Sequence, residues 1–193
     1  MDWLRARTEA GMPTADRGGI DESSGLARAA RVFATHCHSQ QRRGDGARFI
    51  EHPLEVARLL REAGCSDVVV AAGLLHDVVE DAAVSADELR ERFGADVADL
   101  VLAVTEDARV TSYRRRKRLL REQVRRAGDD AALVFAADKI SKVRELDAQA
   151  LRDRTAALRL EHYRASLGML QSVAPEHPLV GRLADELGAR PRG

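Results

Sequence analysis

The sequence predicts an all-α protein that folds as a helical bundle, and three observations support this prediction. From Ser24 onward almost every segment repeats its apolar residues with helical period, and no segment alternates as a strand does. Of the 193 residues, 45% are hydrophobic and 32% are charged, which is the balance of a folded globular protein. That length suits one domain with its own core. We therefore expect a helical domain over residues 23–190, preceded by a flexible polar tail over residues 1–22.

The helices can be placed in order along the chain. The first has its apolar face at residues 26–37, and a loop over residues 43–51 follows. The second spans residues 52–64, because proline fits the first turn of a helix and glycine its end. The third, residues 66–81, is apolar on nearly all sides until its polar end, which predicts a buried central helix. Further helices are expected at residues 85–94, 95–105, 112–127, 129–147, 150–173 and 178–188.

The composition argues against several classes of protein. With 31 basic and 31 acidic residues the formal net charge is zero, so no overall field attracts nucleic acid. No apolar run approaches the roughly 18 residues of a membrane span, and the first residues lack signal-peptide character. Cys37 and Cys65 have no metal-binding spacing and are expected as free thiols of a reducing compartment. We expect a cytoplasmic protein that binds neither nucleic acid nor a membrane.

Polar residues stand where the helical pattern calls for apolar ones. The third helix ends in four ionisable side chains: His76, Asp77, Glu80 and Asp81. Residues four apart on a helix share a face, so His76 lies over Glu80 and Asp77 over Asp81. Such groups at the end of an apolar helix are costly unless partners or a cation neutralise them. A divalent metal is the simplest resolution, because it binds both carboxylates and imidazole nitrogens.

Two further residues are the natural ligands to complete such a site. His52 begins its helix, and Asp138 follows the apolar run of residues 133–137. Together with His76 and Asp77 they form a mixed nitrogen and oxygen set, which suits octahedral Mn²⁺ or Fe²⁺ better than structural zinc. Open positions on such a metal allow a bound water to be acidified. A lone His-Asp dipeptide is usually an ion pair at a helix end, but four such residues in helical context favour a metal site.

Around these residues the sequence resembles the HD-type hydrolase domain of the RelA/SpoT family, in its small single-domain form. The landmarks are the segments HSQQRRGDGARFIEHPLEVA, AAGLLHDVVED, FGADVADLVLAVTED and FAADKISKVREL, which lie between about Leu26 and Leu146. The resemblance implies the all-α HD-domain fold and the Mn²⁺-dependent removal of the 3′-pyrophosphate of guanosine tetra- or pentaphosphate (ppGpp). Fe²⁺ and Zn²⁺ are alternative metals, the partner is a small nucleotide, and no synthetase activity is expected.

The resemblance also implies a role for individual residues. The matching metal ligands are His52, His76, Asp77 and Asp138. Glu80 and Asp81 match the acidic pair that orients or deprotonates the attacking water, and a carboxylate one turn beyond a ligand is well placed for this task. Arg43 matches an arginine that lies against the nucleotide, where a guanidinium can stack on a base and bind phosphate. Arg144 and Lys142 fall in the last motif and are the remaining candidates for substrate binding.

The departures from the family pattern concern the substrate. Three residues replace the family's usual second basic residue, proline and tyrosine: Gly44, Arg48 and Phe49. Lys142 replaces the usual asparagine that contacts the nucleotide, so a cation stands in place of an amide. Two alternatives therefore stay open: an HD-type phosphatase of another phosphorylated nucleotide or dinucleotide cofactor, and a non-catalytic nucleotide-binding regulator. The intact acidic pair favours catalysis over the regulator.

A basic run and several histidines are left outside this site. We expect the run over residues 114–126 to be a solvated helix face, with contact of one or two side chains to the substrate's phosphates as the alternative. His38 is interpreted as a packing group or a support for the site. His162 and His177 have no partner pattern and are expected at the surface.

Overall fold

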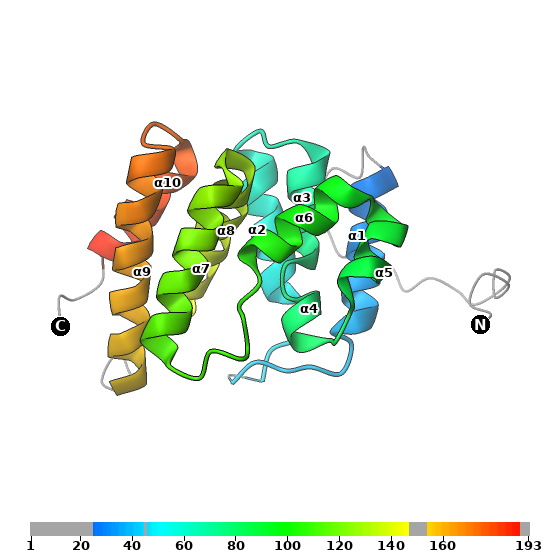
Figure 1. The fold of residues 1–193 in the computed structure, drawn as a ribbon, viewed down its shortest axis with the longest axis horizontal. Coiled ribbons are helices and arrows are strands. Elements are labelled where there is room, and N and C mark those ends of the chain that lie inside the picture. The colour runs from blue at the N-terminus through cyan, green and yellow to red at the C-terminus, as the bar shows by residue number, and fades with distance from the viewer. Residues whose placement is uncertain (1–24, 45, 147–153, 190–193) are drawn as a thin grey trace, which may run out of the picture.

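The computed structural model describes residues 25–44, 46–146 and 154–189, and every regular element within them is a helix (Figure 1). The helices are α1 (Gly25–Cys37), α2 (Glu51–Glu62), α3 (Asp67–Leu75), α4 (Val78–Asp81), α5 (Ala86–Phe93), α6 (Ala95–Val104), α7 (Tyr113–Ala127), α8 (Asp129–Arg144), α9 (Arg154–Val173) and α10 (Pro178–Gly188). The prediction of an all-α bundle is confirmed. The predicted tail, residues 1–22, lies outside the described residues, as do the end of the helix expected at 129–147 and the start of that at 150–173.

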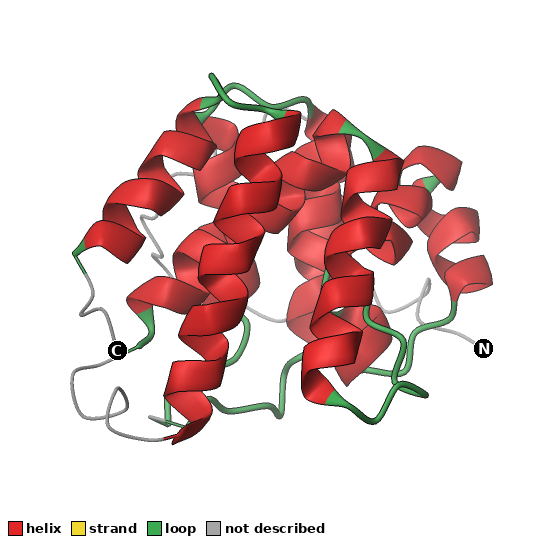
Figure 2. Cartoon of the chain, turned by 60° about the vertical axis from the view of Figure 1, so that its left-hand side comes forward, coloured by secondary structure: helices red, strands yellow, loops and turns green. Residues whose placement is uncertain are grey.

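Two central helices, α3 and α8, organise the bundle. α3 packs against α1, α2, α6 and α8, while α8 packs against α2, α3, α6, α7, α9 and α10. Figure 2 shows the longer helices lying side by side. Every side chain of α3 from Val69 to Leu75 is buried, as expected for a helix that is apolar on nearly all sides. Among the described helices, none is both long and apolar enough to cross a membrane.

Local sequence signals begin and end several of these helices. The Ser66 hydroxyl accepts a hydrogen bond from the backbone N–H of Val69, and the Ser85 hydroxyl accepts one from Glu88. Serine is among the residues preferred at the N-cap of a helix, so these caps follow from the local sequence of α3 and α5. Gly94 has a φ of 87° between α5 and α6, a conformation that L-residues with a side chain rarely adopt.

The predicted third helix, residues 66–81, is interrupted. α3 ends at Leu75 and α4 begins at Val78, with His76 and Asp77 between them. The ring Nδ1 of His76 lies 2.8 Å from the carbonyl oxygen of Gly73, the oxygen that the N–H of Asp77 would bond in an unbroken helix. The expectation of one continuous helix is therefore wrong, because a side chain competes with the backbone for this carbonyl.

Gly73 also sets the distance between α2 and α3. A Cβ atom at this position would lie 2.4 Å from Cδ1 of Leu60 and 3.3 Å from Cγ1 of Val56. Leu60 and Val56 are fully buried, so they have little room to move. The absence of a side chain thus lets α2 approach α3 closely, and this brings together the histidines that the two helices position.

Candidate metal centre and active site

The four predicted metal ligands come together between α2, the α3–α4 junction and α8. His52 lies on α2, His76 and Asp77 lie between α3 and α4, and Asp138 lies on α8. All four are buried, with 3% to 5% of their surface exposed. Nε2 of His52 lies 3.2 Å from Nε2 of His76 and 3.2 Å from Oδ1 of Asp138. The ligand atoms of His52, His76 and Asp138 all lie within 4.8 Å of one another.

Asp77 adds a fourth group to this cluster. Its Oδ2 atom lies 3.1 Å from Nε2 of His76 and 3.5 Å from Nε2 of His52. Among the described side chains, Asp77 Oδ2 and Asp138 Oδ1 are buried oxygens that accept no well-formed hydrogen bond, although Asp138 Oδ1 lies in an ion pair with Lys142. Buried polar atoms are nearly always satisfied, so two such anionic oxygens facing the same imidazoles indicate a place for a cation.

Hydrogen bonds at the far side of each ring fix how the two histidines face this point. His76 Nδ1–H donates to the carbonyl of Gly73 at 2.8 Å. Ser141 Oγ donates to Glu55 Oε2 at 2.7 Å, so it accepts from His52 Nδ1–H at 2.9 Å. Each neutral ring therefore carries its proton on Nδ1 and turns the lone pair of Nε2 toward the other ring. Facing lone pairs repel, so this pair of nitrogens needs a proton or a metal cation beside it.

The electrostatic field of the cluster favours positive charge. Burial alone would lower the pKa of His76, but the charge of Asp77 and the contacts with Asp138 raise it to about 10. Burial would raise the pKa of Asp138, but the ammonium groups of Lys139 and Lys142 hold it well below its ordinary value. Both carboxylates are thus ionised at neutral pH, which is the form that binds a divalent metal.

Two lysines approach Asp138 from different sides. Lys139 is buried, pairs with Oδ2 and lies with its Nζ 4.3 Å from the centre of the Phe135 ring. Lys142 pairs with Oδ1 at 2.9 Å, and its Nζ lies 4.0 Å from Asp77 Oδ1. The side chain of Lys142 is 35% exposed, so its ammonium group lies at the boundary between the buried cluster and solvent.

The predicted acidic pair, Glu80 and Asp81, lies on α4 at the solvent side of the cluster. Glu80 Oε1 accepts a hydrogen bond from the backbone N–H of Glu106. The carbonyl of Asp81 accepts one from Gln41 Nε2 at 2.7 Å, and Gln41 Oε1 lies 2.7 Å from Nδ1 of the buried His38. Partial burial and the charge of Asp77 raise the pKa of both carboxyl groups of the pair. The expectation that His38 supports the site agrees with this chain of hydrogen bonds.

The two predicted arginines differ in position. Arg43 Nη1 lies 3.3 Å from Glu145 Oε1, and that same oxygen lies 3.5 Å from Nδ1 of His52. The side chain of Glu145 therefore connects Arg43 to His52, one of the predicted metal ligands. Arg144 instead binds Glu55 at 2.8 Å and Glu186 at 2.6 Å, which joins α8 to α2 and α10. The structure does not bring Arg144 into the cluster.

Sequence reasoning missed the residues that support His52: Glu55, Ser141 and Glu145. Glu55 lies three residues after His52 on the same helix, and Ser141 lies three residues after Asp138. These spacings are a signal that both share a face with a ligand. Glu145, at the end of α8, offers no comparable signal, because its contact with Arg43 depends on the loop before α2.

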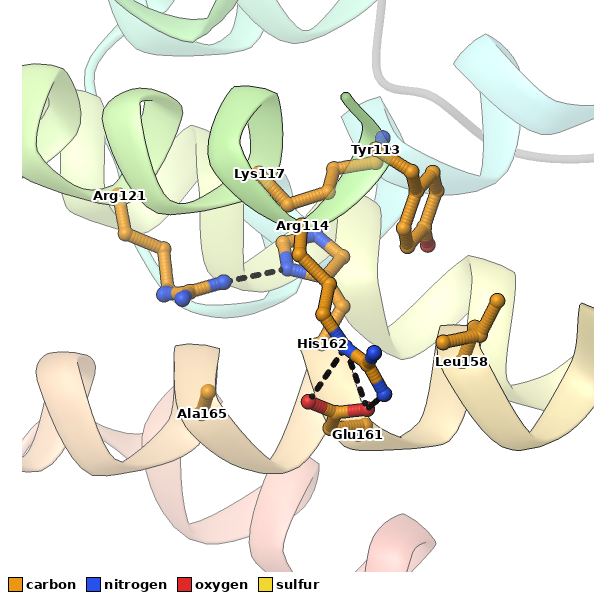
Figure 3. A pocket seen from close by; sticks show the side chains of 8 residues that line it. All are labelled: Tyr113, Arg114, Lys117, Arg121, Leu158, Glu161, His162 and Ala165. Carbon is orange, nitrogen blue, oxygen red and sulfur yellow. Dashed lines mark hydrogen bonds and ion pairs between the residues drawn. The ribbon is translucent and has the colours of Figure 1, made fainter.

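A small cavity of about 60 Å³ lies between α7 and α9 (Figure 3). It is lined by Tyr113, Arg114, Lys117, Arg121, Leu158, Glu161, His162 and Ala165. His162 is 4% exposed, so its expected surface position is wrong. Its ring packs near Phe135 of α8 and accepts a hydrogen bond at Nδ1 from Arg121 at 2.8 Å. His177 is half-buried and caps α10 by accepting from the N–H of Leu179.

The basic run on α7 is more than a solvated face. Arg114 lies at the surface and pairs with Glu161. Arg116 and Lys117 are largely buried and both bind the carboxylate of Glu106. The backbone N–H of Glu106 holds Glu80, so these two cations stabilise the segment next to the acidic pair. The expectation of a fully solvated face is wrong for these two side chains, because the segment between α6 and α7 folds over them.

Comparison with known proteins identifies the family of the chain. Residues 30–165 match the family model described as HD domain. The guanosine-3′,5′-bis(diphosphate) 3′-pyrophosphohydrolase MESH1 of Homo sapiens is 46% identical over 122 residues, and that of Mus musculus is 44% identical over 122 residues. Each alignment covers 61% of this chain and 68% of the relative.

The fold is also similar to that of a solved structure. It is described as "A metazoan ortholog of SpoT hydrolyzes ppGpp and plays a role in starvation responses". The superposition has a TM-score of 0.71 at 26% sequence identity and covers 86% of this chain and 95% of that chain. The matched region of the family model includes every residue of the cluster and of the acidic pair.

Proposed function

This chain belongs to the HD-domain family, as a hydrolase of the RelA/SpoT type, and we propose that it removes the 3′-pyrophosphate of ppGpp or a closely related nucleotide by metal-dependent hydrolysis. The observation that carries the proposal is the convergence in one buried cluster of two imidazole Nε2 atoms with two carboxylate oxygens that accept no well-formed hydrogen bond. The relatives with the highest identities described above are named for this reaction, which gives the substrate class.

The residues proposed to hold the metal are His52, His76, Asp77 and Asp138. Two nitrogen and two oxygen ligands suit Mn²⁺ or Fe²⁺ in octahedral coordination, and Zn²⁺ also accepts such a set. The chemistry that such a metal supplies when bound is the acidification of a water and the neutralisation of phosphoryl charge. The chain contributes two imidazole rings oriented by hydrogen bonds at Nδ1 and two ionised carboxylates, and His76, whose pKa is raised, has to release its Nε2 proton when a metal binds.

Glu80 and Asp81 are proposed to handle the attacking water. They lie one helical turn from the ligands, at the boundary between the buried cluster and solvent. Their raised pKa values make them stronger bases than ordinary carboxylates, which suits removal of a proton from water near neutral pH. The hydrogen bonds to Glu80 Oε1 and to the carbonyl of Asp81 keep α4 in place while this happens.

Arg43 and Lys142 are proposed to face the nucleotide. Lys142 pairs directly with Asp138, and Arg43 pairs with Glu145, which contacts His52. Both side chains are partly exposed. Arg144 is proposed to act indirectly, since its partner Glu55 also holds Ser141, which in turn holds His52. A second candidate function, a phosphatase of another phosphorylated nucleotide, is favoured by the departures from the family pattern at Gly44 and Lys142, since Lys142 places a cation where the resemblance implies an amide.

A release assay across a panel of nucleotides in the presence of Mn²⁺ tests the proposal. We expect pyrophosphate to be released from ppGpp by the wild-type protein and not by His76→Ala. Orthophosphate released from other nucleotides, with ppGpp left intact, would instead support the phosphatase. Binding of ppGpp without turnover under any metal would support the non-catalytic regulator.

A further inference from the structure

Lys142 contacts the oxygen of Asp138 that faces the two imidazoles. Its Nζ lies 2.9 Å from Oδ1, and this same Oδ1 lies 3.2 Å from Nε2 of His52 and 3.6 Å from Nε2 of His76. Oδ1 is therefore the atom that Asp138 would offer to a metal. The ammonium group of Lys142 and a divalent metal ion would therefore compete for the same negatively charged oxygen.

Lys139 provides an internal comparison, because it binds the same carboxylate at the other oxygen. It pairs with Oδ2 and is buried against the Phe135 ring, so moving it into solvent would break both contacts. Lys139 thus binds the carboxylate oxygen of Asp138 that faces away from the cluster. Of the two lysines, only Lys142 binds Oδ1, the oxygen that faces the two imidazoles.

The environment of Lys142 allows it to move. About a third of its side chain is exposed, and it lies near the end of α8, whereas Lys139 and both carboxylates are buried. A long flexible side chain at the boundary with solvent can swing out at a modest cost in free energy. Metal binding at Asp138 then requires either that this ion pair breaks or that its positive charge stays about 4 Å from the ion.

We propose that Lys142 is a built-in competitor of the divalent metal, one that occupies Asp138 Oδ1 and weakens metal binding at the four-residue cluster. The inference rests on the proposed metal centre and adds a role for Lys142 that differs from substrate recognition. A side chain without charge at position 142 could not compete in this way. The wild-type chain is therefore expected to bind Mn²⁺ more weakly than a variant with a neutral residue at this position.

The experiment is a titration of the metal-free protein with Mn²⁺ alone, followed by isothermal calorimetry. We compare the wild type with Lys142→Asn and Lys142→Met, which remove the charge, and with Lys142→Arg, which keeps it. We expect both neutral variants to bind Mn²⁺ at least about tenfold more tightly than the wild type, in the range over which outer groups tune metal sites. Lys142→Arg should stay close to the wild type.

Thermal unfolding gives a second readout that needs no substrate. The Mn²⁺-induced rise in Tm should be larger in Lys142→Asn and Lys142→Met than in the wild type at equal metal concentration. Equal Kd values for wild type and both neutral variants, with His76→Ala unable to bind, would overturn this inference and leave the metal centre standing. Absence of Mn²⁺ binding in every variant, the wild type included, would overturn the metal centre and this inference together.

Discussion

At the scale of single residues, a buried carboxylate oxygen that accepts no well-formed hydrogen bond is unusual, and this site has two: Asp77 Oδ2 and Asp138 Oδ1, of which the second is ion-paired with Lys142. Both lie beside imidazole nitrogens whose protons are held on the opposite side of the ring. Two carboxylate oxygens and two imidazole nitrogens, all able to bind a proton or a metal ion, therefore lie close together. The pair on α4 differs from them, because Glu80 and Asp81 remain open to solvent.

Glu80→Gln and Asp81→Asn should keep the fold and the metal and lose most turnover. Each change leaves the side-chain volume nearly constant and removes a proton acceptor, so kcat should fall about 10²- to 10⁴-fold. The measurements are initial rates with ppGpp and the metal content of the purified variants. Asp87→Asn, on the exposed face of α5, serves as the control and should leave the rate unchanged. Near wild-type rates in both α4 variants would rule out the proposed role.

Arg43→Ala should raise KM for the nucleotide about 10- to 150-fold, since a charge-assisted contact with substrate contributes about 1.5–3 kcal/mol. kcat should fall as well if the contact strengthens in the transition state. The control is Arg90→Ala, a surface arginine on α5 that pairs with Asp99. The measurement is KM and kcat for the nucleotide in both variants. An unchanged KM in Arg43→Ala would show that this side chain does not contact the nucleotide.

At the scale of helices, the site depends on the break between α3 and α4 and on the close approach of α2 to α3. The break turns His76 back onto the carbonyl of Gly73, which fixes its ring. The approach brings α2 and its His52 within 3.2 Å of that ring, measured between the two Nε2 atoms. A single glycine thus takes part in both the packing and the hydrogen bonding of the centre.

Gly73→Ala should destabilise the protein by about 1–3 kcal/mol, because its Cβ would overlap buried Leu60 and force the two helices apart. Gly181→Ala is the matched control, a helical glycine on α10 with no atom within 4 Å of the added Cβ. It should stabilise by about 0.5–1 kcal/mol through helix propensity. Urea midpoints measure both, and equal stabilisation in the two variants would contradict the close contact at Gly73.

At the scale of the whole molecule, ion pairs between distant helices surround the site. Arg144 on α8 binds Glu55 on α2 and Glu186 on α10, with distances of 2.8 Å and 2.6 Å. Burial would raise the pKa of Glu55, but the hydrogen bonds from Arg144 and Ser141 lower it overall. The bundle therefore holds His52 through a network that spans three helices.

Arg144→Ala should lower the free energy of unfolding by about 1–3 kcal/mol, because two partly buried carboxylates lose their partner. It should also weaken Mn²⁺ binding, since Glu55 would hold Ser141 and His52 less firmly. Arg182→Ala, which breaks a more exposed pair between α10 and α2, should cost about 1 kcal/mol or less. Denaturant unfolding and Mn²⁺ titration of both variants provide the comparison. Equal losses would show that the Arg144 network has no special role.

Mn²⁺ should stabilise the whole bundle, because its ligands come from three separate parts of the chain. At a metal concentration of about 100 Kd the gain is about 2.7 kcal/mol, which corresponds to a rise in Tm of roughly 5–10 °C. His76→Ala should lose most bound metal and most of this rise, whereas His36→Ala, at the surface of α1, should keep both. Full retention of metal in His76→Ala would refute the ligand assignment.

The sequence by itself determined the elements and the types of chemistry. Helical periodicity is a local property, so it located the helices to within a few residues, and the caps at Ser66 and Ser85 were readable for the same reason. Ionisable residues in apolar surroundings stand out without any structure, which is why His52, His76, Asp77 and Asp138 were identified as one set.

Only the tertiary structure decided which atoms meet. The break at His76, the burial of His162 and the outward pairing of Arg144 depend on neighbours that lie tens of residues away in the chain. The pairing of Lys139 and Lys142 with Asp138 was also decided by the tertiary structure. The spacing along α8 places both lysines near the carboxylate but does not determine which oxygen each lysine binds. Periodicity reports which face of a helix is buried, whereas packing between helices sets the distances and directions of the groups on that face.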